Sequence, residues 1–223
     1  MVADLVSWSG PLILGSGSPR RSELLRRLGV PFVVEIRQID ESVPGAGHDT
    51  AADAALAIAK AKFAAFESSN PPQQTSTVLT ADTLVSCNGR LMGKPESNRD
   101  VAEMLHYMSG QTIIISTAMC AGPSDRLPRC EVATTRVDLR VLSDADIAIY
   151  ATSDVGLDKA GGLALQSEAA GFIESVDGCW SNVLGLAVCV VAGLLRESCN
   201  EISSADRCSR ALCGSPRPAN GTS

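Results

Sequence analysis

The apolar residues of this chain fall into short clusters separated by polar segments that contain glycine and proline. In the first third, Pro11–Gly15 is typical of a strand, and residues 18–28 are typical of a helix that begins after an N-cap serine and ends at a glycine. Residues 32–37 are rich in β-forming side chains. Residues 49–66 are rich in alanine, which favours a long helix. This region therefore predicts a strand, a helix, a second strand and a second helix.

The middle of the chain predicts antiparallel strands around one helix. A β-branched run ends at Asn88-Gly89, which is a strong signal for a hairpin turn. Further on, apolar residues recur at helical spacing, and two more β-rich segments flank a Gly-Pro turn. The predicted elements are strands over 77–87, 90–93, 112–121 and 130–142 and a helix over 97–108.

The last third predicts a smaller set of elements and a polar tail. The elements are a helix over 143–151, a glycine-rich loop over 158–166, a strand over 171–176 and a final helix over 181–197. The apolar run 183–195 has 13 residues, fewer than the ~20 that a membrane span requires, so we expect a buried helix and no membrane association. Residues 199–223 are polar and contain proline and glycine, which predicts a disordered tail. The mixture of helices and hairpins favours an elongated α/β fold with a central mixed sheet.

Composition limits the possible ligands. The chain has 223 residues, of which 45% are hydrophobic, and a formal net charge of −6. A negative net charge argues against binding of a nucleic acid polymer, which relies on many lysines and arginines. An anionic substrate must therefore be held by a local basic cluster.

The eight cysteines and two histidines also restrict the chemistry. The N-terminus lacks the basic and apolar regions of a secretory signal, which predicts a reducing, cytoplasmic location. Without a C-x-x-C pair we expect no structural zinc site. For the cysteines of the tail, two interpretations stay open: they are exposed, reactive thiols, or they are incidental residues without a role. The predicted small buried thiols are Cys87, Cys120, Cys130, Cys179 and Cys189, and the tail cysteines are Cys199, Cys208 and Cys213.

The segment from Leu14 to Leu25 has the features of an anion site. A strand leads into small residues, and Arg20 and Arg21 follow where a helix begins. Backbone N–H groups at a helix N-terminus and forked guanidinium donors both favour a phosphate chain. An ordinary capped helix with solvated arginines is the alternative. Neither a Walker A loop nor a dinucleotide fingerprint is present in the sequence.

Asp82 is the strongest candidate for chemistry, because it lies within an apolar β-forming run. Burying a carboxylate is costly without a partner, and such residues are enriched at functional sites, where they activate water or hold a cation. A structural role at a strand end is the alternative. Each of the other candidates gives only a weak indication of function when it is taken alone, and by default each is a solvated or an ordinary loop residue. These candidates are Glu41, Lys60, Lys62, Lys94, Asp158, Lys159 and Gln166.

Together these segments resemble the Maf family of nucleoside triphosphate pyrophosphatases. The matching motifs occur in the family's order from about residue 12 to residue 195. They are S-x-S-P-R-R at 16–21, Asp-Glu at 40–41, L-A-x-x-K-A at 56–61, A-D-T at 81–83, G-K-P at 93–95, S-G-[KRQ]-T at 109–112 and D-K-A-G at 158–161. The resemblance implies one domain over residues 1–198, with two lobes around a central cleft, and a homodimer.

The resemblance also implies hydrolysis of a nucleoside triphosphate between the α and β phosphates. Asp82 would be the catalytic base or would activate water through a metal. Glu41 and Asp82 would hold a divalent cation, Mg²⁺ with Mn²⁺ and Co²⁺ as alternatives. The residues that would bind substrate are Ser16, Arg20, Arg21, Lys60, Thr83, Lys94, Asp158, Lys159 and Gln166. A nucleotide-binding regulator of cell division without turnover is the alternative.

Within the family, the S-P-R-R form with a later I-Q-G goes with enzymes that take dTTP and UTP. Arg20, Thr83 and Gln166 match the discriminating positions, which implies a preference for pyrimidine nucleotides. The sequence departs from this pattern at Leu165-Gln166-Ser167. Serine in place of glycine could narrow the pocket, so the base preference stays open at this point.

Overall fold

The computed structural model describes residues 12–67, 76–165, 168–195 and 213. A seven-stranded mixed sheet forms its centre, in the order β2-β1-β3-β5-β6-β7, and β4 pairs with β3. β1 is parallel to both β2 and β3, and the remaining pairs are antiparallel. The strands are β1 (Leu12–Leu14), β2 (Phe32–Val34), β3 (Thr77–Cys87), β4 (Arg90–Met92), β5 (Thr112–Pro123), β6 (Arg129–Leu139) and β7 (Ile173–Asp177).

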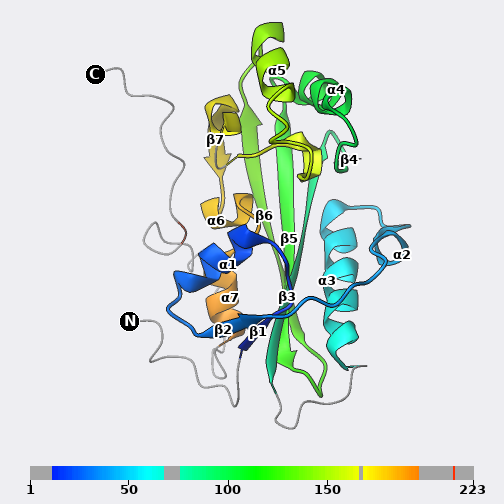
Figure 1. Cartoon of the computed structure of the whole chain (residues 1–223), viewed down its shortest axis with the longest axis vertical. Coiled ribbons are helices and arrows are strands. Elements are labelled where there is room, and N and C mark those ends of the chain that lie inside the picture. Colours follow the sequence, from blue (N-terminus) through cyan, green and yellow to red (C-terminus); the bar gives the residue numbers. More distant parts are fainter. Residues whose placement is uncertain (1–11, 68–75, 166–167, 196–212, 214–223) are drawn as a thin grey trace.

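Helices cover both faces of this sheet, and β3, β5 and β6 run along the length of the molecule (Figure 1). The predicted elongated α/β fold with a mixed sheet is therefore confirmed. The α-helices are α1 (Pro19–Arg26), α2 (Ser42–Gly45), α3 (Ala51–Glu67), α4 (Asn98–Met108), α5 (Asp144–Ala151), α6 (Trp180–Val183) and α7 (Val188–Leu194), and two 3₁₀ helices are η2 (Ala160–Gly162) and η3 (Glu168–Phe172). None of the helices in the described ranges is both long and apolar enough to cross a bilayer.

Three apolar clusters hold these layers together. α1 and α7 pack on one face of the sheet around β1, β3 and β5. α3 packs on the other face through Ala55, Ala59 and Phe63, whose spacing of four residues forms one helix face. α4 and α5 cover the far end of the sheet (Figure 1). Residues of the last cluster, among them Val85, Ile115 and Leu163, also line the cavity that contains the functional candidates.

Three predicted elements differ from the structure. The second strand ends at Val34, and α2 follows the acidic pair where only loop was expected. The final helix is divided into α6 and α7. Gly185 lies between them with φ +100°, a conformation that side chains disfavour and that a helix cannot contain.

The cysteine predictions are partly wrong. Cys120 and Cys130 are directly opposite on β5 and β6 and form a disulfide, so they are not separate thiols. The pairing register of β5 and β6 places the two cysteines opposite each other, and the spacing of the cysteines in the sequence does not by itself predict this register. The other predicted thiols, Cys87, Cys179 and Cys189, are buried and not disulfide-bonded. Of the predicted tail, only Cys213 is among the described residues, and it is buried rather than exposed.

Candidate active site

A cavity of about 500 Å³ lies between the loop before α1, the middle of β3, the β3–β4 hairpin and the segment 158–165. One part of its lining is charged and the other is apolar. The charged residues are Arg20, Arg21, Glu41, Lys62, Asp82, Lys94, Asp158 and Lys159. The apolar residues include Val85, Met92, Ile115, Leu163, Leu165 and Val183, which all belong to one packed cluster.

An acidic pair bridged by a lysine lies at the charged end. Lys62 Nζ donates to Asp82 Oδ1 at 2.7 Å and lies 2.8 Å from Glu41 Oε1. Asp82 and Lys62 are largely buried, with 8% and 15% of their side chains exposed, whereas Glu41 is half exposed. Burial would raise the pKa of Glu41, but the hydrogen bond and charge of Lys62, with the charges of Lys94 and Arg21, outweigh burial and lower that pKa.

The helical phase of α3 explains why this lysine is Lys62. Lys62 lies three residues after Ala59 and four before Phe66, both of which are buried against the sheet. Lys60 follows Ala59 by one residue and is exposed on the outer side of the helix. Lys62, and not Lys60, is therefore among the residues that line the cavity, and a substrate-binding role of Lys60 stays a prediction.

Arg21 joins several parts of the chain. Its Nη1 donates to Ser16 Oγ at 3.0 Å and to the carbonyl of Ala81 at 2.8 Å. Its Nη2 donates to Thr83 Oγ1 at 3.0 Å, and its Nε donates to the carbonyl of Gly185 at 2.9 Å. Burial lowers the pKa of Arg21, partly offset by the charge of Asp82. Most of its donors are thus used by the protein itself.

Thr83 and Ser16 are committed to the same network. The Thr83 hydroxyl also lies 2.9 Å from that of Thr117 and 3.4 Å from the carbonyl of Gly185. Ser16 Oγ additionally accepts from the backbone N–H of Ser18 at 3.3 Å. Ser18 is the N-cap of α1, as predicted, but its side chain makes no capping bond. These hydroxyls shape the cavity wall through bonds to protein groups.

Arg20 and Lys94 are different from Arg21. Both line the cavity, and within the described part of the chain neither side chain forms a hydrogen bond or an ion pair. Lys159, in contrast, donates to the carbonyl of Val155 at 2.8 Å and pairs with Asp158. The hydrogen bond from Lys159 lowers the pKa of Asp158. Arg20 and Lys94 therefore have all their side-chain donors available for an anionic ligand, whereas Lys159 already uses two of its three.

The segment 158–165 is shaped by glycines and one tyrosine. Gly161 and Gly162 have φ of +68° and +67°, and the N–H of Gly161 donates to the carbonyl of Gly93 at 2.8 Å. Tyr150 Oη donates to the carbonyl of Gly162 at 3.0 Å and accepts from the N–H of Ala164 at 2.7 Å. These bonds hold Leu163 and Leu165 in the apolar lining.

Comparisons with known proteins agree with this arrangement. The family model described as "Maf-like protein" matches residues 11–198. The chain belongs to the Maf family. Similar proteins named dTTP/UTP pyrophosphatase occur in Moorella thermoacetica (40% identity over 185 residues, 82% of this chain and 93% of the relative), Hahella chejuensis (38% over 190 residues, 83% and 91%) and Deinococcus radiodurans (37% over 190 residues, 83% and 91%).

The charged end of this Maf cavity has suitable ligands for a hard divalent cation. Asp82 Oδ2 and Glu41 Oε2 accept no hydrogen bond from the residues that the structure describes. Carboxylate oxygens are typical ligands of Mg²⁺ and similar ions, which also take oxygens from phosphate and water. The residues present therefore fit such a cation.

The Maf motifs led to most of the cavity but missed two residues of its lining. The structure brings together Ser16, Arg20, Arg21, Glu41, Asp82, Thr83, Lys94, Asp158 and Lys159. Gln166 lies outside the described residues. The two missed residues are Gly185, which was not singled out, and Lys62, which was expected to be solvated. The buried face of α3 could have indicated Lys62, but no pattern marks a single carbonyl such as that of Gly185.

Proposed function

We propose that this Maf protein hydrolyses pyrimidine nucleoside triphosphates, dTTP and UTP, to the nucleoside monophosphate and pyrophosphate. The observation that carries this proposal is the charged end of the cavity, where two carboxylates bridged by Lys62 line the same cavity as Arg20 and Lys94. The names of similar Maf proteins support the choice of substrate.

We assign activation of water to Asp82. Its strand pairs with β5 through Asp82 and Ala118 and is covered by α3, so the carboxylate has a fixed position. Lys62 holds Oδ1, and Oδ2 is left to bind a water or a cation. A positioned carboxylate can take a proton from water as the water attacks the α-phosphorus. Glu41 and Asp82 would hold Mg²⁺, with Mn²⁺ or Co²⁺ as alternatives, and a bound divalent cation stabilises charge on phosphate oxygens.

The triphosphate would lie against Arg20, Lys94 and Lys159. Their charges offset the negative charge that accumulates on the leaving pyrophosphate. Ser16 and Arg21 shape the loop that faces the phosphates, because their side chains bond to one another and to the cavity wall. Asp158 would act by orienting Lys159, with which it pairs.

The apolar lining would hold the base. Leu163, Leu165 and Ile115 offer flat apolar contacts that do not distinguish pyrimidines from purines by hydrogen bonding. Because the Thr83 hydroxyl has three protein partners, we assign base recognition to Gln166, whose amide can both donate and accept. A site built to pair such groups penalises a base that leaves them unpaired.

A panel of standard and modified nucleoside triphosphates tests this function. Purified protein is incubated with Mg²⁺, and pyrophosphate is measured separately from orthophosphate. We expect pyrophosphate with the highest kcat/KM for dTTP or UTP, and we expect Gln166→Ala to reduce the preference among bases more than it slows the best substrate. Release of orthophosphate, or a purine preference, would contradict the proposal.

Binding without turnover is less well supported. A regulator that only binds nucleotide does not need a fixed carboxylate at a position suited to hold a cation, and the buried, hydrogen-bonded Asp82 of this chain supports such a role. The family resemblance also implies a homodimer, and nucleoside triphosphate substrates suggest a cytoplasmic location. Light scattering of the purified protein and fractionation of cells test these two points.

A further inference from the structure

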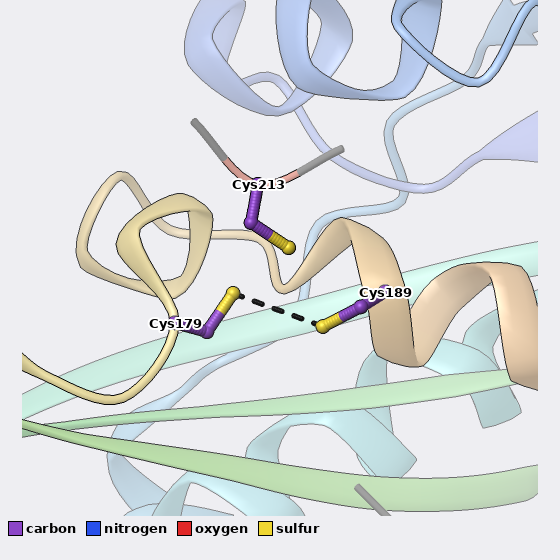
Figure 2. A group of neighbouring side chains, drawn as sticks. All are labelled: Cys179, Cys189 and Cys213. Atoms are coloured by element: carbon purple, nitrogen blue, oxygen red, sulfur yellow. Dashed lines mark hydrogen bonds between the residues drawn. The ribbon is translucent and has the colours of Figure 1, made fainter. Parts of the chain in front are cut away.

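Three cysteines from separate segments meet behind the cavity wall. Cys179 lies immediately before α6, Cys189 lies in α7, and Cys213 comes from the C-terminal extension. All three are buried, and their sulfur atoms lie within 4.8 Å of one another. Figure 2 shows the three side chains with their sulfurs turned toward a common space. None of them lines the cavity described above.

The sulfur spacing matches metal coordination better than a disulfide. Cys179 Sγ and Cys189 Sγ are 3.8 Å apart, far beyond the ~2.05 Å of an S–S bond. Tetrahedral coordination with Zn–S bonds of ~2.3 Å places two sulfurs about 3.8 Å apart. The observed pair therefore has the separation of two ligands on one ion.

The surroundings also suit a thiolate site. The cysteines belong to an apolar cluster, so water is largely excluded. Ser181 Oγ accepts from the N–H of Val188 at 3.0 Å and lies 3.1 Å from Cys179 Sγ. If Cys179 is a thiolate, the Ser181 hydroxyl is the group that donates in this contact. Hydrogen bonds to ligating sulfurs are a regular feature of metal sites and fix the ligand position.

We propose that Cys179, Cys189 and Cys213 bind one thiophilic metal ion, Zn²⁺, that ties the C-terminal extension to the core. Three soft sulfur donors select such an ion over Mg²⁺ or Ca²⁺. Each thiol loses one proton when the ion binds, and a fourth ligand completes the tetrahedron. The absence of a C-x-x-C pair predicted no zinc site, but here the ligands come from distant segments.

The site would also hold one wall of the nucleotide cavity. Cys179 and Cys189 bracket the segment that carries Val183, Leu184 and Gly185, and these three residues line the cavity. An ion bound at both ends of this segment limits its movement. Metal binding itself does not depend on the reaction proposed above, so its test measures metal rather than turnover.

The experiment measures metal in the full-length chain. Protein is expressed with added Zn²⁺, purified without chelators, and analysed for zinc by mass spectrometry. The variants are Cys213→Ser, Cys189→Ser and the control Cys87→Ser, since Cys87 is also buried and not disulfide-bonded but lies in β3 outside the cluster. Apo protein is then titrated with Co²⁺ under reducing conditions, because thiolate ligands give charge-transfer and tetrahedral d–d bands.

We expect about one zinc per chain in the wild type and in Cys87→Ser, with a roughly tenfold or larger loss in the two cluster variants. Co²⁺ should give thiolate bands only where zinc binds. Circular dichroism checks folding, and Cys213→Ser is decisive because its change lies outside the matched domain. Zinc-free wild type, full zinc content in Cys213→Ser, or a Cys179–Cys189 disulfide found by peptide mapping would each overturn the proposal.

Discussion

The cavity has two walls that are held in different ways. The first, here called the bonded wall, consists of Ser16, Arg21, residues 81–83 and Gly185, and side-chain hydrogen bonds from Arg21 connect all its parts. The second, the loop wall, is the segment 158–165, which is held by backbone hydrogen bonds, two left-handed glycines and Tyr150. The bonded wall carries Asp82, whereas the loop wall carries Leu163 and Leu165.

This difference suggests that the bonded wall serves catalysis and the loop wall serves binding of the base. Reacting groups must be held within a fraction of an ångström, which a network of charged hydrogen bonds can achieve. Contact with a base tolerates more adjustment, because apolar surface is not directional. We therefore expect changes in the bonded wall to affect rate and stability, and changes in the loop wall to affect binding and selectivity.

The largest effect is expected for Asp82→Asn. The amide keeps the size of the side chain but cannot accept a proton or neutralise a cation, so kcat should fall by roughly 10²–10⁴-fold. Asp125→Asn, in the exposed turn between β5 and β6, is the matched control. The measurements are steady-state kinetics and calorimetric nucleotide binding. Wild-type rates in Asp82→Asn would remove this residue from the mechanism.

Lys62→Met should remove the cation that bridges Asp82 and Glu41. It leaves the buried Asp82 carboxylate without its cation, which should cost about 3 kcal/mol of unfolding free energy, the lower end for a buried pair, and should lower kcat. Lys60→Met, on the exposed side of the same helix, is the control and should change neither quantity appreciably. Denaturant unfolding and kinetics check both variants. If Lys60→Met were the damaging change, the phase argument for α3 would be wrong.

Arg21→Met and Arg20→Met test the bonded wall with two adjacent residues. Arg21→Met removes donors to two carbonyls and two hydroxyls, so we expect a loss of about 2–3 kcal/mol of stability. Arg20→Met should keep stability within about 0.5 kcal/mol, but should raise KM roughly tenfold, since a charge-assisted bond to phosphate is lost. Thermal unfolding and KM measurements separate the two. Equal destabilisation by both changes would contradict the assignment.

The smallest effect is expected for the loop wall. Tyr150→Phe removes the bonds to Gly162 and Ala164 and should cost about 1–2 kcal/mol of stability. We expect KM and the ratio of kcat/KM between dTTP and UTP to change more than kcat. Tyr107→Phe is the control, because Tyr107 is the other tyrosine and is exposed. A fall in kcat alone would place Tyr150 with the bonded wall instead.

The sequence predicted the local elements better than their relations in space. Apolar periodicity and turn residues were sufficient for α4, the β3–β4 hairpin and the pair β5–β6. These elements depend on interactions between residues close in the chain. The division of the final helix was missed because it depends on Gly185, whose carbonyl is bonded by Arg21 from the other end of the chain.

The candidate site shows the same limit. Motif order led to Asp82, Arg20 and Lys94, because each lies within a short recognisable segment. Lys62 was passed over for Lys60, since only the packing of α3 on the sheet decides which lysine faces inward. For Cys213 the sequence left an exposed thiol and an incidental residue open, because a polar neighbourhood in sequence gives no indication of a contact with Cys189.

The bonds of Arg21 have a consequence for the order of folding. They join the loop before α1 to β3 and to Gly185, and Arg21 and Gly185 are 164 residues apart in the chain. During synthesis, the cavity therefore stays incomplete until the chain beyond β7 has emerged and docked against α1. Fragments that end before Gly185 lack one of the acceptors that orient this arginine. Nucleotide binding is therefore expected only once the whole domain has folded. A nascent chain that ends before Gly185 lacks a complete site for the nucleotide.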